Sequence, residues 1–273
     1  NEIWATFLWT LVLSFSYLLA LITGPVVGAY VDVTGSKKKV LFVVTLGCAL
    51  STIVLSTAGR GDLWFAALFL VISNYFFSIG ENIIGSYLPQ IAKKESVGRV
   101  SGIGWAIGYF GGILTLALSL VTIYQLESMG WEAEEYVPMT LVITGVVFLL
   151  AAMPTFIYLD RDEIKKIDNL SISFVTNRFL DTLRQGDRFV DLYRFLLSTV
   201  FFQGGVQAVI ALAAIYAQQV IGFTFTETIM LIMVVNVTAA LGAYIFGRLH
   251  DFMGHRQSLI LILTGWIVVT LLA

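Results

Sequence analysis

Glu81 is the one acidic residue well inside an apolar stretch of this chain. A carboxylate is costly in a lipid bilayer, so an acid within a membrane segment is a candidate functional group. Asn74, Ser78 and Asn82 lie at helical spacing from Glu81, so the four side chains share one helix face. This face has the groups to bind a polar solute and to carry a coupling proton. The alternative is a Glu81 that pairs with a basic residue and holds helices together.

Thr199, Gln203 and Gln207 form a second polar stripe, spaced by four residues. The two amides offer donors and acceptors that suit a polar or zwitterionic solute. The alternative is hydrogen bonding between helices, worth about 0.6–2 kcal/mol each. The predicted pathway for substrate or proton consists of Asn74, Glu81, Asn82, Gln203, Gln207 and Asn236.

The sequence gives little indication of disulfides, metal sites or catalytic motifs. Cys48 is the single cysteine, which excludes a disulfide framework. His250 and His255 lie in a loop without cysteine or carboxylate spacing typical of a metal site, and we interpret them as solvated loop residues. The sequence holds no nucleophile elbow, phosphate loop or paired carboxylates. We therefore expect no enzyme, no metal and no cofactor.

The elements that position these residues follow from composition. The chain has 273 residues, 58% hydrophobic and only 12% charged, whereas soluble domains have about 25% charged residues. A net charge of -2 gives no indication of a nucleic-acid partner. Because about 20 apolar residues span a bilayer as a helix, the composition predicts an all-α, multi-pass membrane protein. The eight predicted segments are 3–31, 40–58, 63–88, 100–123, 139–159, 195–220, 227–249 and 257–273.

Basic residues predict the topology. All of the 16 Lys and Arg except Arg60 fall in four loops on one side of the membrane: those near residues 37–39, 93–99, 161–194 and 248–256. Positive charge collects on the cytoplasmic side, so these loops are expected in the cytoplasm. The third of them, 160–194, is the long polar connection, and its spaced apolar residues predict a short helix lying on the membrane face.

Two of these loops carry the same motif, Gly-x-x-x-Asp-x-x-Gly-x-(Lys/Arg). We call residues 28–37 the first motif loop and residues 247–256 the second motif loop. All four motif positions are separated by the same offset, 219 residues, which indicates duplication of a large unit. Their aspartates have the charge to pair with a basic neighbour or to cap a helix N-terminus, and so to hold an inner gate shut. The alternative is a simple turn with basic anchors. The predicted gating residues are Gly28, Asp32, Gly35, Lys37, Gly247, Asp251, Gly254 and Arg256.

The duplication also predicts the domains. If each half has six helices and the motif follows the second of them, the eight segments are helices 2 to 9 of a twelve-helix protein, and the chain is a fragment of it. The expected division is a first bundle at 1–159, a cytoplasmic linker at 160–194 and part of a second bundle at 195–273.

Glycines predict one close helix contact. Gly104, Gly108 and Gly112 are spaced by four residues in the segment 100–123. Such a ridge of small residues lets a second helix approach closely, so we interpret it as a packing surface.

The motif pattern resembles the major facilitator superfamily, whose signature loop lies between helices 2 and 3 and often recurs between helices 8 and 9. Two further stretches resemble the Atg22-like, or vacuole effluxer, family: Leu88–Ala92 with Gly98–Gly112, and Gly204–Gln207 with Ala211–Tyr216. The resemblance covers nearly the whole chain. One difference is Gly204, where this family often has an acidic residue.

The resemblance implies the major facilitator fold of two related six-helix bundles, incomplete here. It also implies a secondary active transporter that moves a small polar solute, with an amino acid as one candidate and a proton as a possible coupling ion. The alternative is a membrane receptor or scaffold that retains the fold without transport. The expected location is the cell membrane for a bacterial protein and the vacuolar membrane for a eukaryotic one.

Overall fold

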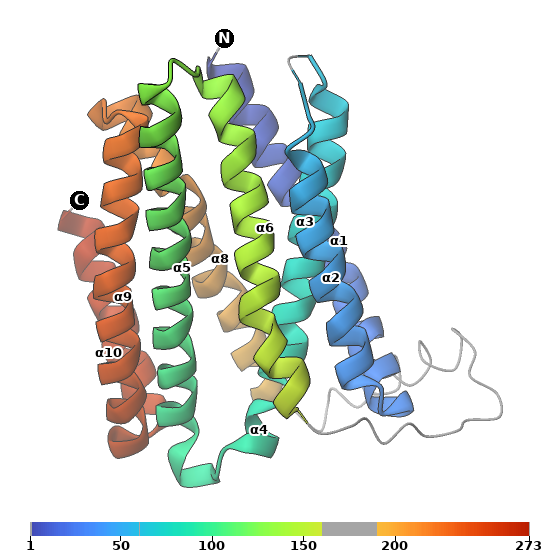
Figure 1. The fold of residues 1–273 in the computed structure, drawn as a ribbon. Helices are drawn as coiled ribbons and strands as arrows, with labels where there is room; N and C mark the ends of the chain where they lie inside the picture. Colours follow the sequence, from blue (N-terminus) through green and yellow to red (C-terminus); the bar gives the residue numbers. More distant parts are fainter. Residues whose placement is uncertain (1, 60, 160–189, 273) are drawn as a thin grey trace. The chain divides into compact units, whose positions relative to one another are not determined.

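The computed structural model describes residues 2–59, 61–159 and 190–272. Within these ranges eight helices are long and apolar enough to cross a membrane, and no strand is found. Each corresponds to one predicted segment, so the all-α membrane fold is confirmed. The helices, in chain order (Figure 1), are α1 (Glu2–Thr34), α2 (Lys37–Leu55), α3 (Leu63–Gly85), α5 (Val97–Ser128), α6 (Ala133–Tyr158), α8 (Val190–Tyr216), α9 (Phe225–Met253) and α10 (His255–Leu272).

Three short elements complete the described chain. They are α4 (Leu88–Ile91), the 3-10 turn η1 (Lys94–Ser96) just before α5, and the π-helical turn η3 (Ala217–Ile221) that extends α8. The helix predicted on the membrane face between 160 and 194 falls almost entirely on residues 160–189, which lie outside the described residues.

Both motif loops are tight turns between long helices. Gly35 has φ 66° and its N–H donates to the carbonyl oxygen of Val31 at 2.9 Å, which ends α1 only two residues before α2 begins. Gly254 has φ 83° and its N–H donates to the carbonyl oxygen of His250 at 2.9 Å, between α9 and α10. These left-handed conformations favour glycine, which explains why both copies carry glycine there.

Contacts divide the chain into two compact units. The first contains residues 1–85 and 118–189. Within it α2 packs between α3 and α6, and α1 packs on α3. The helices approach closely at Gly145, where a methyl group would lie 2.6 Å from Ile53 and 3.1 Å from the carbonyl oxygen of Ala49. Leu41 and Ile79 are buried in this unit.

At one end of the first unit, two helix ends that adjoin predicted basic loops meet. The ammonium of Lys38, one residue beyond the first motif loop, donates to the carbonyl oxygen of Leu159 at the end of α6. Nearby, Phe42 and Phe156 stack edge to face with ring centroids 5.3 Å apart. The beginning of α2 and the end of α6 therefore meet at the same end of the helices, as the predicted topology requires.

The second unit contains residues 86–117 and 190–273. It includes the first part of α5, although α5 belongs to the predicted first bundle. The contact grouping therefore runs across the predicted boundary between the duplicated halves. It does not test where each half begins and ends, so the division into 1–159, 160–194 and 195–273 stays a prediction.

Candidate gate and solute pathway

The second motif loop is bound to the beginning of α5. One carboxylate oxygen of Asp251 accepts a hydrogen bond from the backbone N–H of Gly98 at 2.8 Å, and the other accepts from the N–H of Arg99 at 2.8 Å. The first N–H groups of a helix have no partner within the helix, and a negative charge is favourable at this end. We call this pair of hydrogen bonds the Asp251 clasp.

Three glycines make the Asp251 clasp possible. A methyl group at Gly98 would lie 2.6 Å from both Asp251 Oδ1 and the carbonyl oxygen of Gly247. A methyl group at Gly102 would lie 2.9 Å from the Cα atom of Gly247, and one at Gly247 would meet the backbone of Gly98 and Gly102. Since backbone atoms of the facing helix are among the obstacles at each of these glycines, α5 and α9 (Figure 1) could not lie so close here with larger residues.

This contact corrects the predicted glycine ridge. A methyl group at Gly104 or Gly108 would meet no other atom within 4 Å, so these two glycines do not pack against a described helix. Only Gly112 faces α9, where a methyl group would lie 3.4 Å from Oδ1 of Asn236. The close approach lies one turn nearer the start of α5, at Gly98 and Gly102.

The first motif loop has a different environment. Asp32 is 73% exposed and lies 3.9 Å from the ammonium of Lys37, the basic residue of its own motif. A methyl group at Gly28, the counterpart of Gly247, would meet nothing within 4 Å. The two copies thus display the two predicted uses of the motif aspartate: Asp32 pairs with a basic neighbour, and Asp251 caps a helix.

The remaining basic motif residue, Arg256, is exposed at the start of α10. Arg248 of the same loop lies over the ring of Tyr244, 4.2 Å from the ring centroid.

The predicted polar face of α3 lies partly against α1. The amide of Asn74 donates to Oγ of Ser16 at 2.6 Å, and Ser16 is fully buried. About two turns further along α3, Asn82 lies near Gly24, where a methyl group would be 3.7 Å from its amide nitrogen. Glu81 is exposed and forms no ion pair with a described residue. The four residues therefore do not form one surface: Asn74 is hydrogen-bonded to α1, whereas Glu81 is exposed.

We expect the Asn74–Ser16 hydrogen bond to contribute to stability. In a double-mutant cycle with Asn74→Ala and Ser16→Ala, thermal unfolding of the full-length protein in detergent should give a coupling energy of about 0.6–1.7 kcal/mol. The pair Gln203→Ala and Ser16→Ala is the matched control and should be additive. A coupling of zero for Asn74 and Ser16 would contradict this structural role.

The polar stripe on α8 is uncovered. Gln203 and Gln207 are both exposed, and a methyl group at Gly204 or Gly205 between them would meet nothing within 4 Å. Asn236 is half-buried on α9, donates to the carbonyl oxygen of Ile232 at 2.8 Å, and turns its Oδ1 toward Gly112 of α5. The structure does not bring the α8 glutamines into contact with Asn236, so their shared role in a pathway stays a prediction.

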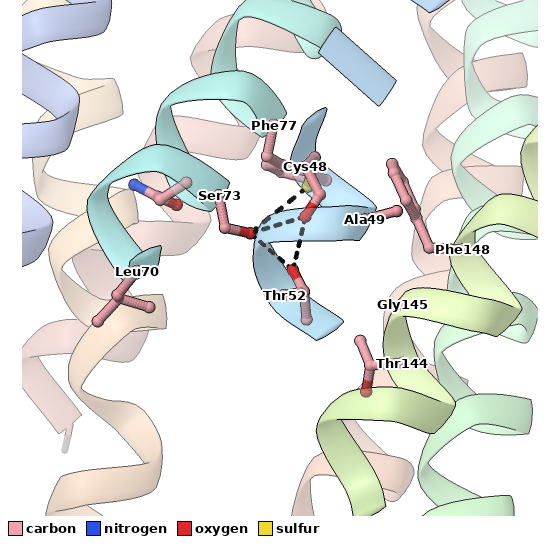
Figure 2. A pocket seen from close by; sticks show the side chains of 10 residues that line it. Cys48, Ala49, Thr52, Leu70, Ser73, Phe77, Thr144, Gly145 and Phe148 are labelled. Atoms are coloured by element: carbon pink, nitrogen blue, oxygen red, sulfur yellow. Dashed lines mark hydrogen bonds between the residues drawn. The ribbon is translucent and has the colours of Figure 1, made fainter. Parts of the chain in front are cut away.

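A small pocket of about 250 Å³ lies in the first unit between α2, α3 and α6 (Figure 2). Its polar side chains already have partners: Oγ of Ser73 lies 2.7 Å from Oγ1 of Thr52 and 3.6 Å from Sγ of Cys48. The hydroxyl of Thr144 donates to the carbonyl oxygen of Thr140, and the amide of Asn74, which also lines the pocket, donates to Ser16. Apolar residues such as Phe77 and Phe148 form much of the remaining wall. Because its hydroxyl groups are already hydrogen-bonded, this pocket is a poor site for a polar solute.

Sequence reasoning missed two features of the second unit. The first is the partner of Asp251, the start of α5, although Gly98 and Gly102 are spaced by four residues and were visible as a second small-residue pair. The second is the pairing of His250 with His255, whose ring nitrogens lie within hydrogen-bond distance. The interpretation of these histidines as solvated loop residues is therefore wrong in one respect: they lie at two helix ends and contact each other, although the contact is exposed. Among the residues that the structure describes, no group of three or more His, Cys, Asp or Glu has metal-binding geometry.

Eight membrane-spanning helices and the duplicated motif loops define a multi-pass membrane protein of the major facilitator type. A family model described as "Vacuole effluxer Atg22 like" matches residues 92–273. The chain belongs to this family.

Individual relatives agree with this assignment. The chain is 25% identical over 86% of its length to the "Uncharacterized MFS-type transporter YxiO" of Bacillus subtilis (strain 168), and covers 55% of it. It is 27% identical over 90% of its length to a "Putative proline/betaine transporter" of Staphylococcus haemolyticus (strain JCSC1435), covering 53%. It is 24% identical over 62% of its length to "Autophagy-related protein 22" of Cryptococcus neoformans, covering 33%. No solved structure matches the chain.

The family and the two bacterial relatives are named for transport and not for an enzymatic reaction, in agreement with the expectation from the sequence. The chain spans about half the length of the first two relatives. The solute of the whole protein is therefore proposed below.

Proposed function

We propose that the full-length protein is a secondary active transporter that moves a small polar solute by alternating access. The observation that carries this proposal is the Asp251 clasp. It joins α5 of the predicted first half to α9 of the predicted second half, at the end of the helices where the basic loops lie. Hydrogen bonds between a carboxylate and backbone N–H groups can break and re-form without rearranging a packed core. Such a contact suits a gate that closes one face of the membrane and opens when the halves rock apart.

The solute is proposed to be a zwitterion of the amino-acid class. Gln203 and Gln207 on α8 and Asn236 on α9 offer amide donors and acceptors within membrane-spanning helices, and they carry no net charge. A neutral amide lining suits a solute whose charges balance. The names of the staphylococcal relatives, which mention proline and betaine, support the same class.

Glu81 is proposed as the group that couples transport to protons. It is exposed within α3 and forms no ion pair with a described residue, which disfavours the alternative of a purely structural carboxylate. A carboxyl group in this position can exchange a proton between two faces of a membrane as access alternates.

Replacement of Glu81 by glutamine should remove the proton dependence of transport. In proteoliposomes, we expect solute uptake by Glu81→Gln to lose most of its response to an imposed pH gradient, because the amide cannot release a proton. Glu134→Gln, a change of the same chemistry at the start of α6, should leave the response intact. An unchanged response in Glu81→Gln would remove the coupling role from this residue.

The transport proposal itself is tested with the full-length protein in liposomes. Radiolabelled proline, glycine betaine and alanine are offered with and without a pH gradient, and accumulation of at least one of them is expected. Binding of a solute without movement, under every gradient, would favour the alternative of a membrane receptor or scaffold. If the protein neither binds nor moves any of these zwitterions, the proposed solute class is wrong.

A further inference from the structure

The two histidines of the second motif loop form a pair across a helix break. His250 lies in the last turn of α9 and His255 begins α10, with Gly254 between the helices. Nε2 of His250 and Nδ1 of His255 lie 2.5 Å apart, with ring centroids separated by 4.5 Å. They are the only two histidines of the chain.

The pair lies directly beside the Asp251 clasp. A methyl group at Gly98 would lie 2.8 Å from Cδ2 of His250, so the edge of this ring rests on the first turn of α5. The next residue, Asp251, makes both hydrogen bonds of the clasp. The ring of His250 therefore lies at the contact between α9 and the start of α5, next in sequence to the residue that holds α5.

The number of protons on the pair decides whether it can stay closed. Two neutral imidazoles fit this geometry, because one ring nitrogen donates its N–H and the other accepts with its lone pair. One additional proton also fits, since the donor is then a cation and the hydrogen bond becomes charge-assisted. With both rings protonated, each facing nitrogen carries an N–H, no acceptor is left, and two positive charges lie side by side.

We propose that His250 and His255 are a proton-sensitive positioning pair for the Asp251 clasp: the pair holds the clasp while it shares a hydrogen bond and releases it when both rings are protonated. This inference rests on the proposed gate. It adds a second proton-sensitive element to the transporter, separate from Glu81 on α3, and makes the basic face of the membrane the place where acidification is sensed.

The charged groups beside the pair are of both signs. The carboxylate of Asp251 follows His250 in sequence and is bound to the start of α5. The exposed side chains of Arg99 and Arg256 flank the clasp and His255 in sequence. On α9, Arg248 is directed over Tyr244. A second proton on the pair adds a positive charge among these cations and removes the only acceptor between the rings, and this is the step that opens the pair.

A transition-metal site fits these two rings less well. Two nitrogen ligands of one tetrahedral zinc ion, each about 2.0–2.1 Å from the metal, lie roughly 3.3 Å apart. The observed separation is 2.5 Å. In the part of the chain that the structure describes, no third His, Cys, Asp or Glu completes a metal-binding group. The ring nitrogens approach each other directly and leave no room for an ion between them, so a hydrogen bond fits the pair better than a metal.

The test measures the gate without measuring transport. In full-length protein carrying Cys48→Ser, spin labels are attached at Glu95→Cys in η1 and Phe252→Cys in the second motif loop; both positions are exposed. The distance distribution between them is recorded from about pH 8 to about pH 5, the range in which histidine changes charge. We expect a predominantly short distance at the higher pH and a shift toward longer distances on acidification.

Substitution of either histidine shows whether the acid-induced change in distance comes from this pair or from another titrating group. In His255→Gln and His250→Gln the acid-induced shift should be lost, whereas Glu134→Gln, at the start of α6, should retain it. A shift that persists in both histidine variants, or no shift in the parent protein, overturns the proposal. So does a distance that responds to zinc chloride at constant pH but not to pH, which would make the pair a metal site. A failure of solute uptake in liposomes leaves this readout unaffected, so the two proposals fail separately.

Discussion

Replacement of Asp251 by alanine is expected to slow solute transport by at least about tenfold. The change removes both hydrogen bonds that hold the start of α5 and leaves the N–H groups of Gly98 and Arg99 without the carboxylate. Hydrogen bonds to a charged group contribute about 1.5–3 kcal/mol each, and about 1.4 kcal/mol corresponds to a tenfold change in an equilibrium. The closed state of the gate should therefore become a minor one. Uptake in proteoliposomes, at equal amounts of inserted protein, measures the effect.

Two variants calibrate this result. Asp251→Asn retains one acceptor oxygen without the charge and should give an intermediate rate. Asp191→Asn removes an exposed carboxylate at the start of α8, where it pairs with Arg194 at 3.6 Å, and should transport normally because exposed ion pairs contribute little. Transport by Asp251→Ala at the parent rate would show that the clasp is a structural turn, the alternative reading of the motif.

Gly102→Ala is expected to have the second large effect. The added methyl group would lie 2.9 Å from the Cα atom of Gly247 and even nearer the backbone of Ala243, so α5 and α9 must move apart. Overpacking of this kind costs about 1–3 kcal/mol, and here it also stretches the hydrogen bonds of Asp251. We expect a lower thermal midpoint in detergent together with reduced uptake.

Gly104→Ala and Gly108→Ala are the matched controls, since a methyl group at either position meets nothing within 4 Å. All three changes replace glycine by alanine in the same helix, so helix propensity favours each of them equally. If the controls lose as much stability as Gly102→Ala, the close contact between α5 and α9 is not the cause.

The sequence was sufficient to predict the helices because lipid imposes a simple rule. A spanning helix needs a long apolar run, so the eight segments and the turns at Gly35 and Gly254 could be found without knowing any contact between helices. The positions of the basic residues predicted which loops lie on one side of the membrane, again without knowledge of any contact between helices. Two hydrogen bonds agree with this predicted topology, one within each unit. Lys38 binds the end of α6, and Asp251 binds the start of α5.

Contacts between helices were harder to predict. Glycine spacing alone made Gly104, Gly108 and Gly112 a plausible ridge, but which side of α5 faces a neighbour depends on where α9 lies. Likewise, the spacing of Asn74 and Glu81 could not show that Ser16 of α1 takes the amide of Asn74. Sequence periodicity shows which side chains share a face of one helix, whereas a binding site depends on the relative positions of several helices.

The two motif loops illustrate this limit within one molecule. They share the same residue pattern, yet Asp32 is exposed beside Lys37 and Asp251 is bound to another helix. The pattern specifies a turn that presents a carboxylate at a helix end; the partner decides what the carboxylate does. Their common role in gating therefore stays a prediction, supported here by the second copy.

The most direct test of the gate is the distance between spin labels at Glu95→Cys and Phe252→Cys in the full-length protein, reconstituted in liposomes at constant pH with and without a transported zwitterion. Alternating access predicts two populations, a short distance with α5 held by Asp251 and a longer one with the clasp broken, whose proportions change when solute is added. A single short distance that neither solute nor Asp251→Ala alters would contradict the account, because the two helices would then be a fixed part of the fold.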